Sequence, residues 1–241
     1  NYIYIFEGCL RFDAELCMTL KTYLSTLYFC ILTWVLTLII GFFVAYFLAF
    51  YVKTIPVQIA LFLICTIPFW TSNVIRMVSW IPLLGRNGLI NDTLISIGLI
   101  DTSIEWLLYS EFSVILALVH LYTLFMIVPI FNSMIRIDKS IIEGAYDAGA
   151  GEMQILTNII VPLCKPGIAI GSIFVITVVM GDFVTIGIMG GQQLASIGKI
   201  INTEMNYLQL PGAAANAVIL LLITIIIIIT MTKFIDIRKE L

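Results

Sequence analysis

Long apolar stretches alternate with short polar segments along the whole chain. A helix needs about 20 mostly apolar residues to cross a bilayer, and five stretches are that long, at residues 27–51, 57–80, 112–131, 168–189 and 213–234. Hydrocarbon offers no partner to backbone N–H and C=O groups, and these runs are too long and too uniform for barrel strands. We therefore predict an all-α, polytopic membrane helical bundle that forms one transmembrane domain over residues 1–241. Kinks are expected near Pro68 and Pro129.

The polar segment 132–166 separates the third and fourth predicted spans. Its first half is small and polar around Gly144 and Gly149. Its second half has apolar residues at nearly helical spacing, at Met153, Ile155, Leu156, Ile159 and Ile160. This pattern predicts a short helix, a turn at residues 149–151, and a second helical segment that Pro162 and Pro166 redirect. Small residues let the backbone of another molecule come close, so we interpret this segment as a docking element.

Composition narrows the class of protein further. Hydrophobic residues make up 61% of the 241 positions and charged residues only 11%, whereas soluble domains carry about 25% charged residues. The net charge of −3 comes from 12 basic and 15 acidic residues, so we expect no basic surface for nucleic acid. The five cysteines form no CxxC pair and His120 is the single histidine. We therefore predict no metal site and assign the cysteines to packing.

Basic residues in the loops predict the orientation, because Lys and Arg stay mainly on the cytoplasmic side. One side of the predicted bundle carries Lys53, Arg136, Lys139, Lys165, Lys233, Arg238 and Lys239, and the other carries Arg11, Lys21, Arg86 and Lys199. Segment 132–166 and the C-terminus are therefore expected in the cytoplasm. Five spans that end inside require a start outside, so we expect a sixth, N-terminal helix upstream of Asn1 and an external connection over residues 1–23.

The spacing within segment 132–166 resembles the signature of type I ATP-binding-cassette importer permeases, the inner membrane components of binding-protein-dependent transport systems. That signature is Glu-Ala-Ala, three residues, Gly, nine residues, Ile, one residue and Leu-Pro. This chain has Glu143-Gly144-Ala145, Gly149, Ile159 and Val161-Pro162 at the same spacing. It departs from the signature in having Gly144 for the middle Ala and Val161 for Leu.

This resemblance implies a non-catalytic transport subunit of a bacterial inner membrane, whose short coupling helix sits on a cytoplasmic ATPase. The implied contact residues are Glu143, Gly144, Ala145, Tyr146, Asp147 and Gly149. The implied partners are a second permease subunit in a heterodimer, two ATPase subunits that bind ATP and Mg, and an extracytoplasmic substrate-binding protein. The chain has no GxxxxGK[ST] phosphate loop, so no cofactor is expected in the chain itself.

Three further motifs resemble the spermidine/putrescine branch of these permeases. They are Ile-Pro-Phe-Trp-Thr-Ser-Asn at 67–73, Arg-Asn-Gly-Leu-Ile-Asn at 86–91, and Met-Gly-Asp-Phe-Val-Thr at 180–185 with Gly190-Gly191. The branch implies polyamine uptake, with a substrate path that includes Asp182, Trp70, Asn73 and Thr185.

The position of Asp182 supports a place on that path. It follows Ile168 by 14 residues, about 21 Å along a helix that rises 1.5 Å per residue, and so lies in the outer half of the fourth predicted span. Carboxylates inside a membrane normally face the bundle interior or a water-filled path. The alternative role is a helix-packing hydrogen bond to a neighbouring Thr or Tyr.

Other functions remain open at this point. The same importer class carries other small organic solutes. An ion-coupled secondary carrier often shows internal repeats, and none is visible. An intramembrane enzyme would need a nucleophile and base, or a metal cluster, which the residues do not supply. The outer loop 81–111 carries Asp92, Asp101, Glu105 and Glu111 against Arg86, and an acidic mouth of this kind would concentrate a cation.

Overall fold

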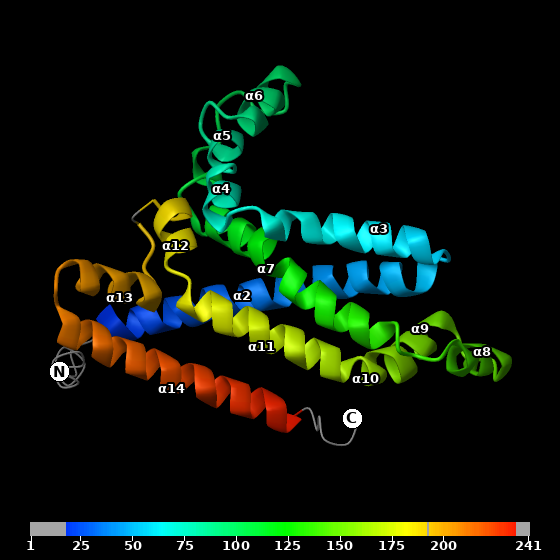
Figure 1. Ribbon diagram of the computed structural model, residues 1–241. Coiled ribbons are helices and arrows are strands. Elements are labelled where there is room, and N and C mark those ends of the chain that lie inside the picture. The colour runs from blue at the N-terminus through cyan, green and yellow to red at the C-terminus, as the bar shows by residue number, and fades with distance from the viewer. Residues whose placement is uncertain (1–17, 192, 235–241) are drawn as a thin grey trace. The chain divides into compact units, whose positions relative to one another are not determined.

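The computed structural model describes residues 18–191 and 193–234, and every regular element in those ranges is a helix (Figure 1). In chain order the elements are α2 (Met18–Tyr46), η2 (Phe47–Tyr51), α3 (Ile55–Thr66), η3 (Ile67–Trp70), α4 (Asn73–Val78), α5 (Ile81–Leu84), α6 (Leu89–Ser96), η4 (Glu105–Leu107), α7 (Glu111–Met134), α8 (Lys139–Asp147), α9 (Glu152–Ile155), η5 (Leu156–Ile160), α10 (Val161–Leu163), α11 (Lys165–Gly181), α12 (Val184–Met189), α13 (Ile197–Asn206) and α14 (Leu210–Phe234). Residues 1–17 of the expected external connection lie outside the described residues, and residues 18–23 are part of α2. Arg11, Arg238 and Lys239 also lie outside the described residues.

Three helical stretches are long and apolar enough to cross a membrane by themselves. They cover Thr19–Tyr51, Glu105–Met134 and Leu210–Lys233. Each covers one of the predicted spans to within one residue, and each presents many apolar side chains outward, such as Phe43 and Ile226. Apolar exposure of this kind suits a hydrocarbon solvent, in which an outward-facing Ile or Phe costs nothing. The structure confirms the first, third and fifth predicted spans.

The second predicted span is not one continuous helix. The helix over Ile55–Trp70 ends in the 3₁₀ turn η3, and the chain turns by 94° before the stretch Asn73–Ser96. Pro68 contributes to this break, because its nitrogen cannot donate to the carbonyl four residues earlier. The two pieces together form a broken span or a re-entrant segment. The mean hydropathy stays high across the break, and for this reason the sequence pattern predicted a single span over residues 57–80.

The fourth predicted span also needs correction. Helix α11 ends at Gly181, and α12 begins at Val184. Asp182 therefore lies in a break between two helices rather than inside a continuous span over 168–189. On its other side, α11 is bent by 64° from the helical stretch Glu152–Leu163. Within residues 18–191 and 193–234 there are thus three uninterrupted helices long and apolar enough to span a membrane, or up to five candidate spans when each bent pair counts as one.

The chain folds into two compact units. The first unit comprises the described residues up to Thr33, together with Thr71–Leu121 and Ile176–Ile225. Within it, α4 packs against α12, α5 against α6, and α12 against α13. Its most deeply buried large side chains are Phe29, Met77, Leu84, Leu118, Met180, Ile186, Met189 and Ile197. Helix α13 begins at the N-cap Ser196, whose hydroxyl accepts a hydrogen bond from the N–H of Lys199.

The second unit comprises Trp34–Trp70, Tyr122–Val175 and the described residues from Ile226 onward. Met126 lies at its centre and is fully buried. A Cβ atom on Gly41 would lie 2.9 Å from Met126 Cγ, and one on Gly171 would lie 2.7 Å from Met126 Sδ. Small residues at these two positions therefore let the backbones of α2 and α11 approach α7, a common device in membrane helix packing.

Candidate functional site

Helix α8 occupies the position of the predicted coupling helix, and its own residues define where it begins. Asp138 is the N-cap, and the N–H of Ser140 donates to Asp138 Oδ1 at 3.0 Å. This hydrogen bond satisfies one of the free donors at the helix start. The same bond favours the carboxylate form and so lowers the pKa of Asp138 below its usual value. Sequence reasoning missed Asp138, although an Asp immediately before an amphipathic run is a recognised start signal.

The C-terminal end of α8 explains the glycine of the signature. Gly149 has a φ of +83°, a left-handed conformation that favours glycine. Its N–H donates to the Tyr146 carbonyl at 2.9 Å, and the N–H of Ala150 donates to the Ala145 carbonyl at 3.0 Å. These two bonds form a Schellman motif, which satisfies the last carbonyls of a helix. The short helix and the turn after it are therefore present as predicted.

The second helical segment begins directly after this turn. The N–H of Gly151 donates to Gln154 Oε1 at 3.0 Å. Helix α9 then passes through the π turn η5 into α10, and its apolar side is anchored by the buried residues Ile155 and Ile160. Pro162 cannot donate to the carbonyl four residues earlier, and the π turn immediately before it accommodates that missing bond.

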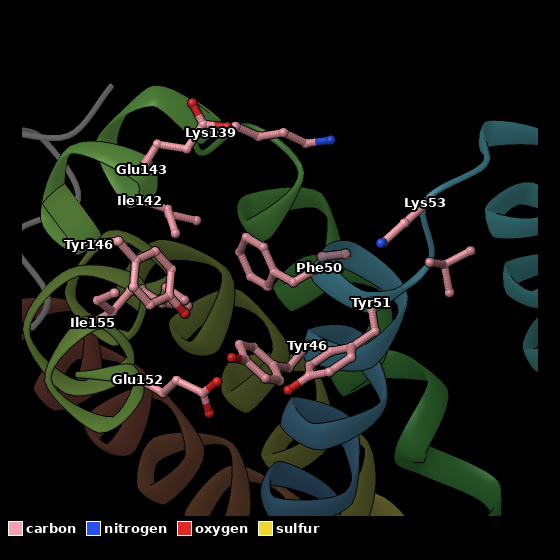
Figure 2. A pocket seen from close by; sticks show the side chains of 13 residues that line it. Tyr46, Phe50, Tyr51, Lys53, Lys139, Ile142, Glu143, Tyr146, Glu152 and Ile155 are labelled. Carbon is pink, nitrogen blue, oxygen red and sulfur yellow. The ribbon is translucent and has the colours of Figure 1, made fainter. Parts of the chain in front are cut away.

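One face of α8 closes a cavity of about 590 Å³ in the second unit (Figure 2). Lys139, Ile142, Glu143 and Tyr146 line it from α8, at the spacing of a single helix face. Its other lining residues are Tyr46, Ala49, Phe50, Tyr51, Val52, Lys53, Glu152, Ile155 and Ile160. The sequence did not predict this cavity, because the aromatic residues from Tyr46 to Tyr51 were assigned to the end of the first apolar span.

The opposite face of α8 is open. Gly144, Asp147 and Ala148 are exposed and line neither the first cavity nor a second one of about 580 Å³ that includes Ile141. A Cβ atom on Gly144 or Gly149 would meet nothing within 4 Å. The six predicted contact residues therefore divide by face: Glu143 and Tyr146 line the first cavity, whereas Gly144 and Asp147 are free to meet another molecule. Ala145 is half-buried.

The predicted substrate-path residues are only partly brought together. Thr185 donates twice to the Asp182 carboxylate, from its N–H to Oδ1 at 2.9 Å and from its hydroxyl to Oδ2 at 2.6 Å. Asn73 lies on α4, which packs against the helix of Thr185, and its side chain accepts a hydrogen bond from the Arg76 guanidinium. Trp70 belongs to the second unit and is 85% exposed. These bonds to Asp182 come from a residue three positions later at the start of α12, so they are local to the break and do not join two packed helices.

The single histidine is held by an aromatic neighbour. The Trp80 indole N–H donates to His120 Nδ1 at 2.9 Å, and the two rings meet edge to face at 5.6 Å. An imidazole that accepts at Nδ1 carries its proton at Nε2 in the neutral form. His120 is thus hydrogen-bonded, although its side chain is exposed.

The motif Arg-Asn-Gly-Leu-Ile-Asn at 86–91 builds the outer loop. Asn91 is fully buried, and its amide donates to the carbonyls of Gly85 at 3.0 Å and Ile104 at 3.2 Å. It also accepts from the N–H of Ile104 at 2.8 Å. A Cβ atom on Gly88 would lie 2.8 Å from each of three carbonyl oxygens, those of Pro82, Leu83 and Gly85. Arg86 pairs with Glu105 at 3.4 Å, so part of the predicted acidic mouth is neutralised.

With this geometry established, comparison with known proteins identifies the family. The family described as binding-protein-dependent transport system inner membrane component matches residues 23–239. The chain belongs to this family. Its signature helix is therefore α8, and the signature glycine, Gly149, serves a Schellman turn.

The names of two similar proteins state the substrates that they transport. The spermidine/putrescine transport system permease protein PotB of Salmonella typhimurium (strain SL1344) is 34% identical over 164 residues, which are 68% of this chain and 57% of that protein. PotB of Escherichia coli (strain K12) is 33% identical over 168 residues, covering 69% of this chain and 61% of that protein. The matched segment thus spans less than two thirds of each relative.

A solved structure shares the fold. A chain of a bacterial alginate ABC transporter, crystallised with an alginate pentasaccharide-bound periplasmic protein, aligns with a TM-score of 0.75. The alignment covers 98% of this chain and 86% of that one, at 17% sequence identity. Together with the family match and the apolar helices, this agrees with an inner membrane component of the predicted importer permease fold.

Proposed function

We propose that this chain is a transmembrane permease subunit of an ATP-binding-cassette importer, and that it forms part of the translocation path for a polyamine such as spermidine or putrescine. The observation that carries the proposal is the family match over residues 23–239, which contains α8 with its signature spacing. The names of the PotB relatives support the polyamine class. Another small organic solute is the alternative cargo.

The exposed side of α8 supports a coupling role. Gly144, Asp147 and Ala148 offer a small and accessible surface to a cytoplasmic ATPase. In this proposal two ATPase subunits bind and hydrolyse ATP with Mg, so this chain is not itself catalytic. A second permease subunit completes the path, and an extracytoplasmic binding protein delivers the solute. The excess of Lys and Arg in alternate loops supports a cytoplasmic position for segment 132–166 and for the C-terminus.

In the first unit, the proposed substrate path includes Asp182, Asn73 and Thr185, and Thr185 acts by holding the Asp182 carboxylate. Trp70 is a separate proposed path residue of the second unit. Asp182 supplies the charge, because a carboxylate attracts the ammonium groups of a polyamine. Its location in a break between α11 and α12 supports the assignment, since irregular backbone at membrane depth occurs where it lines a cavity or is buried in protein.

Uptake of labelled spermidine by cells that express the complete transporter tests this role. We expect Asp182→Asn to lower kcat/KM for uptake at least about tenfold, since a lost charge-assisted contact costs roughly 1.5–3 kcal/mol. Thr185→Val is the matched variant, because it removes the hydroxyl donor to Asp182 but keeps the carboxylate. A loss in Asp182→Asn that greatly exceeds the loss in Thr185→Val supports a charge on the path. Equal losses indicate that Asp182 serves only the α11–α12 junction, and uptake of no polyamine by the unmodified transporter rejects the cargo.

A further inference from the structure

The cavity beside α8 has an aromatic wall that the coupling role does not use. Tyr46 lies at the centre of this wall, with its ring centroid 5.2 Å from that of Phe50 and 5.8 Å from that of Tyr51. Tyr146 adds a fourth ring from α8 (Figure 2). Faces of aromatic rings attract cations, and the attraction grows where water is partly excluded. A wall of this kind suits an ammonium group or the methylene chain attached to it.

Two carboxylates line the same cavity from different helices. Glu143 belongs to α8 and Glu152 to α9, and Figure 2 shows the Tyr146 ring in the region between them. Within the described part of the chain, neither carboxylate has an ion pair within 4.0 Å or a hydrogen bond from another side chain. Both are therefore available to a cationic ligand.

Two lysines also line the cavity, so it has as many basic as acidic side chains. Figure 2 shows Lys53 and Lys139 on the side away from Glu152, with the Phe50 ring between that side and Tyr146. The cavity therefore has a basic edge and an acidic end. The acidic end is formed by Glu152 with the tyrosines 46, 51 and 146.

We propose that this cavity is a second polyamine site, distinct from the path at Asp182, which holds one ammonium group at Glu152 and Tyr46 and a second toward Glu143. This inference rests on the proposed polyamine transport. The volume of about 590 Å³ lies within the range usual for small-ligand sites. A polyamine carries several ammonium groups along one chain, so one of them can meet Glu152 while another extends toward Glu143 and the methylene chain lies on the rings, whereas a monoamine has a single ammonium group to offer.

Binding here would connect two parts that the transport cycle moves. The ligand would hold α8 against the end of α2 and η2, and a ligand that favours one arrangement of an alternating machine shifts its population toward that arrangement. With segment 132–166 in the proposed cytoplasmic position, α8 lies on the side into which cargo would be released, and the site would sense polyamine that accumulates there. The expected consequence is slower uptake when polyamine is abundant on the α8 side.

Protection of an introduced cysteine tests the binding site on the purified chain in lipid nanodiscs. Ile142→Cys places a thiol in the cavity, and Ala148→Cys places one on the open face of the same helix. At spermidine ten times above Kd, the free fraction of the site falls about tenfold, so alkylation of Cys at position 142 should slow about tenfold while that at 148 is unchanged. Peptide mass spectrometry separates both sites from the native cysteines.

Carboxamide variants identify the groups responsible. Adding Glu152→Gln should raise the spermidine concentration for half protection about tenfold, through loss of a charge-assisted contact. Asp147→Asn makes the same charge change on the open face and should leave that concentration unchanged. The proposal is overturned if spermidine gives no protection at position 142, if protection survives Glu152→Gln unaltered, if propylamine protects as well as spermidine, or if sodium phosphate protects in its place through the two lysines.

Uptake by membrane vesicles tests the regulatory consequence separately. Loading spermidine on the α8 side should slow the initial rate in the unmodified transporter, and Glu152→Gln should remove this inhibition. Equal inhibition in both overturns the regulatory role. If the vesicles take up no polyamine at all, the proposed function fails, and the cysteine protection on the purified chain still decides whether the cavity binds polyamine.

Discussion

Helix α8 and the outer loop around Asn91 both carry motif glycines, but the surroundings of these glycines differ. A Cβ atom on Gly144, Gly149 or Gly151 would meet nothing within 4 Å, whereas one on Gly88 would lie 2.8 Å from three carbonyl oxygens. The crowded glycine is required by the chain's own fold. The open glycines are required by a backbone conformation, as at Gly149, or leave room for something outside the chain.

The same contrast applies to the polar residues of the two regions. Asn91 is fully buried and makes three hydrogen bonds to backbone groups. Asp147 on α8 is exposed. The resemblance of residues 86–91 to the polyamine branch therefore reflects loop architecture at Gly88 and Asn91, and not contact with a solute. A motif shared with relatives can preserve a fold in one region and a docking surface in another.

The largest expected effect concerns the outer loop. Asn91→Ala should lower the free energy of unfolding by about 3 kcal/mol, because the partly buried backbone groups of Gly85 and Ile104 lose their partner, at about 1–3 kcal/mol each. Thermal unfolding in detergent and limited proteolysis of the loop would measure the loss. Asn87→Ala, at an exposed neighbour, should change stability by less than about 0.5 kcal/mol. Similar unfolding of both variants would show that Asn91 does not hold the loop.

An intermediate effect is expected at the C-terminal end of α8. Gly149→Ala forces a side chain into left-handed backbone at a cost of about 1–2 kcal/mol, which should loosen the turn and reduce ATP-driven uptake. Hydrogen exchange at Gly149 and Ala150 would detect the loosened turn.

Two matched variants sharpen this comparison. Gly149→Asn should cost less than Gly149→Ala, because Asn tolerates the left-handed conformation. Gly144→Ala, inside the same helix and in open space, should instead stabilise α8 by about 0.5–1 kcal/mol. If Gly149→Ala and Gly144→Ala changed exchange in the same direction, the role assigned to the Schellman turn would be incorrect.

The smallest effect concerns pH at the start of α8. The pKa of Asp138 is lowered in the folded chain by the N–H of Ser140. A group with a lowered folded pKa stabilises the fold above its unfolded pKa, and that contribution is lost as the pH falls through the folded value. We therefore expect the protection of the Ser140 amide, measured relative to its intrinsic exchange rate at each pH, to fall below about pH 4, the ordinary range for Asp. Asp138→Asn keeps an acceptor oxygen and should abolish this pH dependence; an identical profile in both chains would refute it.

Local features of α8 were within reach of the sequence. The periodic apolar residues, the small residues of the signature and the glycines after it predicted a helix, a turn and a second helix, and the structure has all three. Such features depend on neighbours two to five residues apart, such as Asp138 with Ser140 and Gly149 with Tyr146. The breaks in the second and fourth predicted spans were not predicted from the sequence. Hydropathy is an average over many residues, and it does not show where the backbone hydrogen bonds of a helix end.

By itself, the sequence determined that this chain is a membrane helical bundle with a short helix in the polar segment between two apolar spans, because hydrophobicity and helical period are local quantities. Only the tertiary structure decided that Trp80 bonds His120 forty positions away, that Asn91 reaches Ile104, and that Tyr46 and Glu152 line one cavity. Such pairings depend on which helix faces meet, and many arrangements of apolar helices satisfy the same hydropathy pattern. Packing selects one of them through close contacts such as Gly41 with Met126.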